Sequence, residues 1–151
     1  MVTAQIEPFT AGIEELKTLI DAHYTELALN QDRVPLDPRW PVYIDRDAAG
    51  EILYITLRDK GSLVGYFIGF IQPGLHYQTC LTCQMDIFYV VPEARGDRNG
   101  YRLFKLAELE CKRRGVQRMF VGSKLHKDAS YLFEKLGDTE VERYYSVWLG
   151  E

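Results

Sequence analysis

The sequence predicts a mixed α/β fold in which an antiparallel hairpin leads into a parallel strand–helix–strand crossover. Apolar residues recur at helical spacing within residues 11–29, and two runs rich in β-forming residues flank a tight turn at residues 59–61. An apolar strand that ends near Pro92 is followed by a polar loop and then a helix. A helix placed between two strands in this way favours a sheet with parallel neighbours.

The composition is that of one globular domain spanning residues 1–151. The net charge of −4 gives no basic field for nucleic acid. No apolar run approaches the roughly 20 residues of a membrane span, and the N-terminus lacks the basic and apolar parts of a signal peptide. Three cysteines are too few for a disulfide framework, so we expect a reduced, cytoplasmic protein.

The N-terminal half is expected to form a helix followed by a hairpin. Thr10 is a candidate N-cap for the helix, and the turn at residues 59–61 sets the hairpin. Three prolines make the region after the first helix a loop. The predicted elements are a strand at 6–9, a helix at 11–29, a loop at 30–41, a helical turn within 44–50, and strands at 51–58 and 62–71.

The C-terminal half is expected to alternate strands and helices. Gly115 and Gly137 are helix stops, and Asp128 is a candidate cap for a short helix. An alternating apolar pattern near the end indicates a last strand. The predicted elements are a loop at 75–79, a strand at 80–91, a helix at 100–114, a strand at 116–121, a helix at 129–136 and a final strand at 140–149.

Residues 86–107 have the pattern of a phosphate-binding junction. A helix start carries unpaired N–H groups and the positive end of the helix dipole. A loop lean in side chains lets a pyrophosphate approach these groups. Arg95, Arg98 and Arg102 add cationic donors at or near the same place.

The same segment resembles motif A of the GNAT N-acetyltransferase superfamily, Gln/Arg-x-x-Gly-x-Gly/Ala after a strand with a Val-x-Pro-like exit. Arg95 fills the first position and Gly100 the last, with PEARG at 92–96 as lead-in. FEKLG at 133–137 is similar to the family's Tyr-Glu-Lys-Leu-Gly segment, and HY with RNGYRLFKLAE is similar to a subgroup from tailed phages and bacteria. The resemblance implies the GNAT acyl-CoA N-acyltransferase fold over nearly the whole chain.

By resemblance, the chain is an N-acetyltransferase that moves an acetyl group from acetyl-CoA directly to an amine. The acceptor would be a small amine, an aminoglycoside-like compound or a protein amino group. The strand backbone would bind the pantetheine arm, the loop would wrap the pyrophosphate, and a loop histidine would lie near the thioester. The implied cofactor-binding residues are Phe88, Tyr89, Val90, Arg95, Gly96, Asp97, Arg98, Asn99, Gly100, Tyr101 and His126. No metal is expected.

A general base must take a proton from the substrate ammonium. Asp86 is the first candidate, because it is a lone carboxylate in an apolar strand, where burial raises a carboxyl pKa. The alternative is a structural carboxylate satisfied by backbone or by an arginine. His76, in the loop before the strand, is the next candidate on the acceptor side. His23 and Glu26 on the first helix are also considered.

The residue at the expected position of the general acid departs from the family pattern. By resemblance a tyrosine would stand at Phe133, which has no proton to give. Tyr131 is the candidate substitute, although two positions away on a helix it points in a different direction. The inner glycine of the motif is Arg98 here, beside Asn99, which tolerates left-handed conformations. These departures motivate an alternative function, a GNAT-fold module that binds coenzyme A or a protein partner without turnover.

A Cys-x-x-Cys at Cys80 and Cys83 raises a third hypothesis, redox or zinc chemistry. With His76 it offers three ligands and no nearby fourth. Residues three apart in a strand face opposite sides, and no helix start is present to lower the pKa of a thiol. The sequence leaves the acceptor open, and also whether the protein forms a homodimer.

Overall fold

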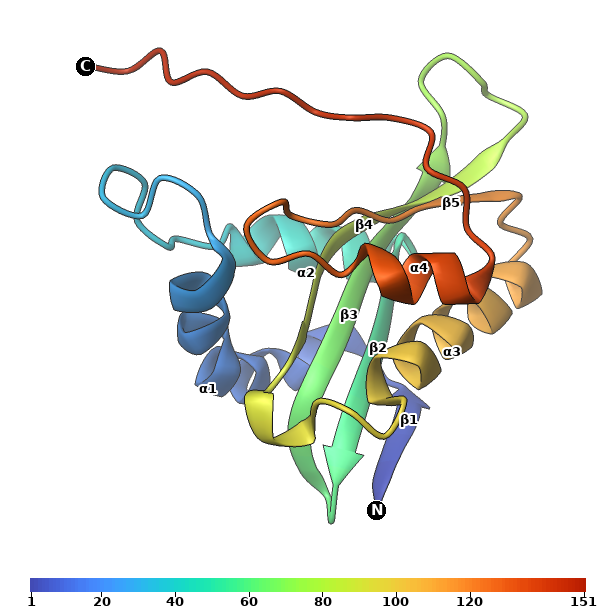
Figure 1. Cartoon of the computed structure of the whole chain (residues 1–151). Coiled ribbons are helices and arrows are strands. Elements are labelled where there is room, and N and C mark those ends of the chain that lie inside the picture. The colour runs from blue at the N-terminus through green and yellow to red at the C-terminus, as the bar shows by residue number, and fades with distance from the viewer.

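The computed structural model describes all 151 residues, and it places helices on both faces of a five-stranded mixed sheet (Figure 1). The strand order is β1-β2-β3-β4-β5; β4 and β5 are parallel and the other neighbours are antiparallel. This is the mixed α/β class expected from the sequence. In chain order the elements are β1 (Val2–Ile6), α1 (Phe9–Leu27), α2 (Trp40–Ala48), β2 (Ile52–Asp59), β3 (Ser62–Pro73), β4 (Leu81–Val90), the 3₁₀ turn η1 (Pro92–Ala94), α3 (Asn99–Arg113), β5 (Arg118–Phe120) and α4 (Ser130–Leu136).

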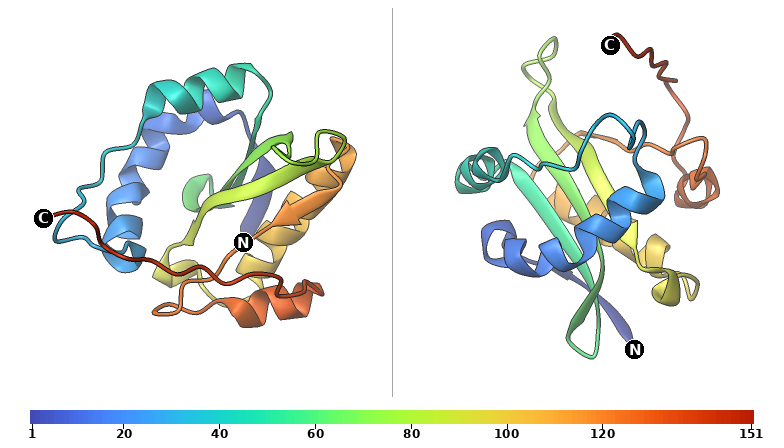
Figure 2. Two further views of the ribbon diagram at one scale, coloured as in Figure 1. Left: turned by 90° about the horizontal axis from the view of Figure 1, so that it is seen from above. Right: turned by 90° about the vertical axis from the view of Figure 1, so that its left-hand side faces the viewer.

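Alternating side chains of the sheet form one apolar cluster on each face. The first contains Leu53 and Phe67, and α3 and α4 pack on it. The second contains Tyr54 and Tyr66, and α1 packs on it with α2 at its margin. Figure 2 shows the sheet lying between the α1–α2 pair and the α3–α4 pair. Any chemistry at a strand end therefore has a different set of helices on each side.

The predicted hairpin between β2 and β3 is confirmed. Asp59 pairs with Ser62, which leaves a two-residue loop of Lys60 and Gly61. Both loop residues have positive φ, 51° and 88°. This is the combination that a type I′ turn requires, and its twist matches that of the two strands.

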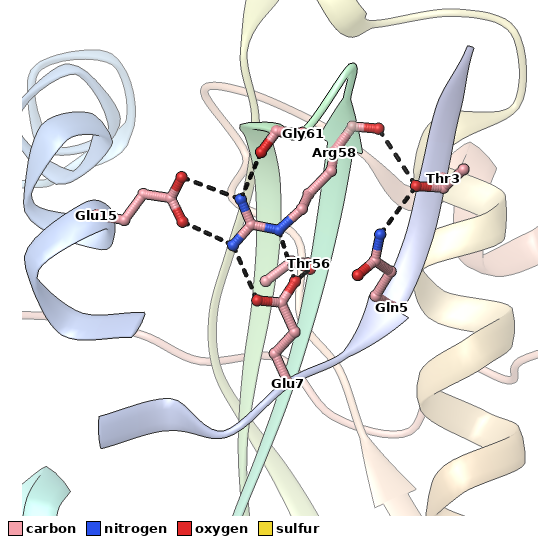
Figure 3. Close-up of polar contacts among 7 residues, drawn as sticks. All are labelled: Thr3, Gln5, Glu7, Glu15, Thr56, Arg58 and Gly61. Carbon is pink, nitrogen blue, oxygen red and sulfur yellow. Dashed lines mark hydrogen bonds and ion pairs between the residues drawn. The ribbon is translucent and has the colours of Figure 1, made fainter. Parts of the chain in front are cut away.

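A polar cluster around Arg58 ties this turn to α1 (Figure 3). The guanidinium donates to both carboxylate oxygens of Glu7 at 2.8 Å, to Glu15 at 2.6 Å and 3.0 Å, and to the Gly61 carbonyl at 2.9 Å. The hydrogen bonds from Arg58 lower the pKa of Glu7 and of Glu15. Bidentate ion pairs of this kind are stronger than single surface contacts, so the cluster fixes α1 on the sheet.

The start of α1 differs from the prediction. The helix begins at Phe9 after Pro8, so Thr10 lies inside it and is not its N-cap. Instead, Asp47 of α2 accepts hydrogen bonds from the Thr10 backbone N–H at 3.0 Å and from its hydroxyl at 2.6 Å. A carboxylate from another helix thus satisfies a free N–H of α1, which sequence periodicity cannot reveal.

Other boundaries shift for identifiable reasons. The first strand is Val2–Ile6, not residues 6–9, because Pro8 leads into α1. The helical turn expected within 44–50 is the longer α2, which begins at Trp40 with Pro41 in its first turn, where a missing N–H costs nothing. No helix in the chain combines the length and the apolar character needed to cross a membrane.

The predicted final strand at 140–149 is wrong in this structure. The segment has no regular structure and runs from α4 toward the α1–α2 connection, where the Arg33 guanidinium lies 5.0 Å from the Trp148 ring (Figures 1 and 2). An alternating sequence favours a strand only when a neighbouring backbone pairs with it. Here β5 pairs with β4 over three residues and with nothing on its other side.

Candidate active site

The polar loop before α3 has an unusual backbone. Gly96, Asp97 and Arg98 all have positive φ, at 93°, 46° and 61°. Only the first is a glycine, and a left-handed conformation costs other residues about 1–2 kcal/mol each. In the resembling motif, Arg98 occupies a position that is normally glycine, and the sequence suggested that Asn99 would adopt the left-handed conformation. The structure puts the left-handed residue at Arg98, while Asn99 is the first residue of the helix. Strain of this kind is typical of functional loops.

This backbone leaves a run of donors free. The N–H groups of five residues make no hydrogen bond within the protein, and no side chain caps α3. They belong to Gly96, Asp97, Arg98, Gly100 and Tyr101. Successive N–H groups at a left-handed turn and a helix start form an anion-binding site. We call residues 96–101 the α3 entry loop.

Side chains on either side of the α3 entry loop hold it in place. Arg95 donates from Nε to the Val90 carbonyl at 2.9 Å and from Nη2 to both oxygens of Glu26 at 2.7 Å. The buried Asn99 amide donates to the Ala94 carbonyl at 2.7 Å. Arg98 makes no ion pair or side-chain hydrogen bond. Of the three arginines that the sequence placed at or near this site, Arg95 braces the loop and Arg102 donates to the carbonyls of Val2 at 3.0 Å and Asp97 at 3.2 Å. Arg98 is free to meet a ligand.

Gly100 allows close packing against α4. A Cβ at this position would lie 3.3 Å from Leu132 of α4, tighter than ordinary contact. The helix start and α4 thus approach each other closely through this glycine. Gly96, in contrast, would meet nothing within 4 Å, so only its φ demands glycine.

The edge of β4 opens beside the α3 entry loop. β5 pairs with β4 only from Thr82 to Gln84, so no strand lies beside β4 beyond that point. The side chains of Phe88 and Val90 pack into the cluster under α3 and α4, and the side chain of Tyr89 is buried on the opposite face. The sequence placed the pantetheine contact on the backbone of these three residues, and the Val90 carbonyl already receives Arg95 at this edge.

Asp86 sits in an irregularity of β4. Ile68 of β3 pairs with Ile87 and Gly69 pairs with Met85, so Asp86 is an extra residue in a bulge. Bulges re-aim side chains and occur beside active sites. The Asp86 carboxylate accepts a 2.5 Å hydrogen bond from the Tyr43 hydroxyl of α2. Burial raises the pKa of Asp86 against the opposing effects of Tyr43 and Arg46, in the direction expected from the sequence.

The other acid–base candidates are scattered. His76 is exposed in the β3–β4 loop, and Asp86 lies roughly 17 Å along the strand from Leu81, where that loop ends. Tyr131 is 63% exposed on α4. Phe133 is buried in the core, with its ring edge-to-face on Phe88 and Phe104. The position of Phe133 offers no donor and no space for a reacting group.

Two histidines connect α1 with the sheet and with the loop after β5. His23 is buried, its Nδ1 lies 2.6 Å from the Tyr66 hydroxyl, and its ring stacks on Tyr89. Burial, with a further effect of Lys124, lowers the pKa of His23 to about 4, so its ring is neutral at pH 7. His126 contacts the Leu27 carbonyl through Nε2 at 3.0 Å, which brings its loop to the end of α1.

The Cys-x-x-Cys pair lies apart from this site. Cys83 is buried in the α3–α4 cluster together with Cys111, and Cys80 is half-buried at the start of β4. Contact with Cys111 and burial raise the pKa of the Cys83 thiol, which is the opposite of what a redox cysteine needs. No group of three or more His, Cys, Asp or Glu side chains is placed to share a metal.

Tyr43 is the contact that sequence reasoning missed. It lies 43 positions from Asp86, between the loop predicted at 30–41 and the helical turn predicted within 44–50. A signal was present, since Trp40 and Tyr43 are three residues apart, the spacing of one helix face. Both pack at the margin of the α1 cluster.

Known proteins agree with this architecture. A family model described as "Acetyltransferase (GNAT) family" matches residues 15–138. A search of curated proteins found no match. Among solved structures, the chain is similar to a ribosomal-protein-alanine N-acetyltransferase from Brucella melitensis biovar Abortus, with 17% identity over 99% of this chain and 100% of that chain and a TM-score of 0.72.

Two further structures share the fold. An aminoglycoside acetyltransferase from an uncultured soil metagenomic sample has a TM-score of 0.75 and 13% identity over 99% of both chains. An acetyltransferase from Clostridium acetobutylicum solved with acetyl-CoA has a TM-score of 0.68 and 13% identity, covering 99% of this chain and 97% of that chain. At these identities the likeness concerns the fold alone.

Proposed function

Since the chain belongs to the GNAT acetyltransferase family, we propose that it is an N-acetyltransferase that transfers an acetyl group from acetyl-CoA directly to an amine. The observation that carries this is the α3 entry loop, whose five free N–H groups and unpaired Arg98 form an anion site beside the open edge of β4. We place the whole chain in one catalytic domain, with no metal.

The residues present fit coenzyme A. The free N–H groups of the α3 entry loop would hold the pyrophosphate, and the Arg98 guanidinium would add charge to the same contact. The backbone of Phe88, Tyr89 and Val90 would hydrogen-bond the pantetheine arm as an added strand would. His126, in the loop that reaches the end of α1, would flank the arm. Acetyl-CoA supplies an activated thioester when bound.

Asp86 would act as the general base on the α1–α2 side of β4. Its raised pKa makes it a better proton acceptor than an exposed carboxylate. Tyr43 orients the carboxylate through its hydroxyl. Removing a proton from the acceptor ammonium leaves a neutral amine that can attack a carbonyl, and holding the two reactants together supplies much of the rate.

The protonation of the leaving thiolate does not need Phe133. Its ring belongs to the core, and a thiolate is a fair leaving group that solvent can protonate. Tyr131, exposed on α4, is the acid candidate predicted from the sequence, and its hydroxyl has a proton to give. The lack of a proton donor at Phe133 favours the second candidate function, a module that binds coenzyme A without turnover.

Free-thiol release from acetyl-CoA over a panel of amines tests the proposal. Release that depends on an added amine supports an acetyltransferase, and coenzyme A binding by calorimetry without any release supports the binding module. Asp86→Asn should reduce amine-dependent release by about 10²–10⁴-fold and retain binding. If neither binding nor release is found, the proposed function is rejected.

A further inference from the structure

One arginine on the α1–α2 side of the sheet lacks a partner for its charge. Arg118 begins β5, and its Nε is buried without a hydrogen-bond partner. It is the one side-chain nitrogen or oxygen of the chain in that state. Its guanidinium lies 5.0 Å from the rings of both Tyr77 and Phe120. Cation–π contacts with two rings position the guanidinium, but they supply no hydrogen-bond acceptor to its N–H donors.

The strand register places Arg118 on the same face as Asp86. Arg118 pairs with Thr82, Met119 with Cys83, and Phe120 with Gln84. Cys83 and Met119 pack toward α3. The residues beside them on each strand, Arg118 and Phe120, therefore face the opposite side. Asp86 also faces that side, because it contacts Tyr43 of α2.

This face is open between the two groups. Gln84 lies between Thr82 and Asp86 on β4 and is exposed, and Arg118 and Phe120 are half-buried. We call Gln84, Asp86, Arg118 and Phe120 the acceptor face. Asp86 lies four residues beyond Thr82, the partner of Arg118, which corresponds to about 10–15 Å.

We propose that Arg118 binds a carboxylate of the acceptor, so that the substrate is an extended amine whose anionic group lies about 10–15 Å from the reacting nitrogen, the span of three to four extended residues. This deepens the proposed function and rests on it. The amine would lie at Asp86 and the chain of the acceptor would cross Gln84. A buried donor without a partner is costly and rare in folded proteins, and a carboxylate in the plane of the guanidinium would satisfy it.

Oligoglycines of one to five residues, each as free acid and as C-terminal amide, test the length and the charge together. With tetraglycine, kcat/KM should exceed that of tetraglycinamide by about tenfold, and Arg118→Gln should reduce this ratio to near one. The loss should appear in KM. Glycine and glycinamide are too short to reach Arg118, so their ratio should not change in the variant. Arg118→Lys should keep part of the preference.

Arg113→Gln is the matched control, since Arg113 is an exposed arginine on α3, and the melting temperature of each variant reports on folding. Turnover of the panel with no preference for the free acid, or with a preference that Arg118→Gln leaves intact, overturns the carboxylate site and leaves the acetyltransferase standing. If no amine is turned over, the proposed function fails. Calorimetry of tetraglycine against its amide in the presence of coenzyme A then decides the site, and equal affinities overturn it.

Discussion

The α3 entry loop and the acceptor face differ in what they are made of. The loop is one contiguous segment whose free groups are backbone N–H donors. The acceptor face takes Asp86 from β4 and Arg118 from β5, and Tyr43 from α2 orients the carboxylate. The two meet at β4, where the strand edge is open beyond Gln84.

This difference separates two properties of the enzyme. A backbone site forms once its local turn and helix form, and side-chain changes alter it weakly. A site built from three elements depends on their packing, and a single side chain can change its chemistry. We therefore expect coenzyme A binding and acceptor turnover to respond to different mutations and to pH in different ways.

The sharpest test of this separation is Asp86→Asn. Turnover should fall by about 10²–10⁴-fold, the usual contribution of a general base, while coenzyme A affinity measured by calorimetry stays within about twofold. Because burial raises the pKa of Asp86, its ionised form is disfavoured by the fold, and the amide should not lower the melting temperature.

The pH dependence of kcat/KM in the wild type and in Asp86→Asn gives a second test of the base. A raised pKa shifts the acidic limb of kcat/KM to higher pH, since the base must be ionised. Coenzyme A binding should show no such limb. Asp45→Asn, which changes an exposed carboxylate of α2, is the control. Wild-type turnover in Asp86→Asn would place the base elsewhere.

The free energy of unfolding should also depend on pH, through a buried histidine on the α1 side of the sheet. The folded pKa of His23 is about 4, below the value of about 6.5 for an unfolded histidine. Its contribution is present above pH 6.5 and is lost as the pH falls toward 4, by about 3 kcal/mol in total. Urea unfolding at pH 7 and pH 5 should show a smaller difference for His23→Gln than for wild type. His126→Gln, on an exposed loop, should behave as wild type.

Two substitutions at Arg98 distinguish the backbone strain of the α3 entry loop from the contact of its guanidinium with a ligand. Arg98→Gly relieves the left-handed backbone and should raise stability by about 1 kcal/mol, whereas Arg98→Ala keeps the strain. Both lose the guanidinium and should weaken coenzyme A binding by about tenfold. Calorimetry together with thermal unfolding measures both quantities. If both variants bind normally, the backbone alone carries the pyrophosphate.

The smallest effect is expected at the brace of the loop. Glu26→Gln removes the charge that pairs with Arg95 at 2.7 Å. The pair is partly exposed, so stability should fall by about 0.5–1 kcal/mol, with a few-fold weaker coenzyme A affinity. Glu14→Gln, which breaks a more exposed pair with Lys17, is the control. An equal loss of affinity in both variants would argue against the brace.

The sequence by itself determined the features that depend on neighbouring residues. The β2–β3 turn follows from the short Asp59-Lys60-Gly61 segment between two runs of β-forming residues, in which Gly61 takes its positive φ without steric cost. The mixed α/β class follows from the order of periodic segments, and the family is shown over residues 15–138. The raised pKa of Asp86 was also expected, because a lone carboxylate in an apolar strand is desolvated wherever that strand packs.

Only the tertiary structure decided the features that join distant segments. Asp47 rather than Thr10 satisfies the start of α1, Tyr43 holds Asp86, and Arg118 lies on the face of Asp86 through strand register. The same reason explains the failed strand at 140–149, whose alternating pattern has no pairing partner. Periodicity along a chain specifies which faces are apolar, but contacts across 30 or more residues depend on how those faces pack.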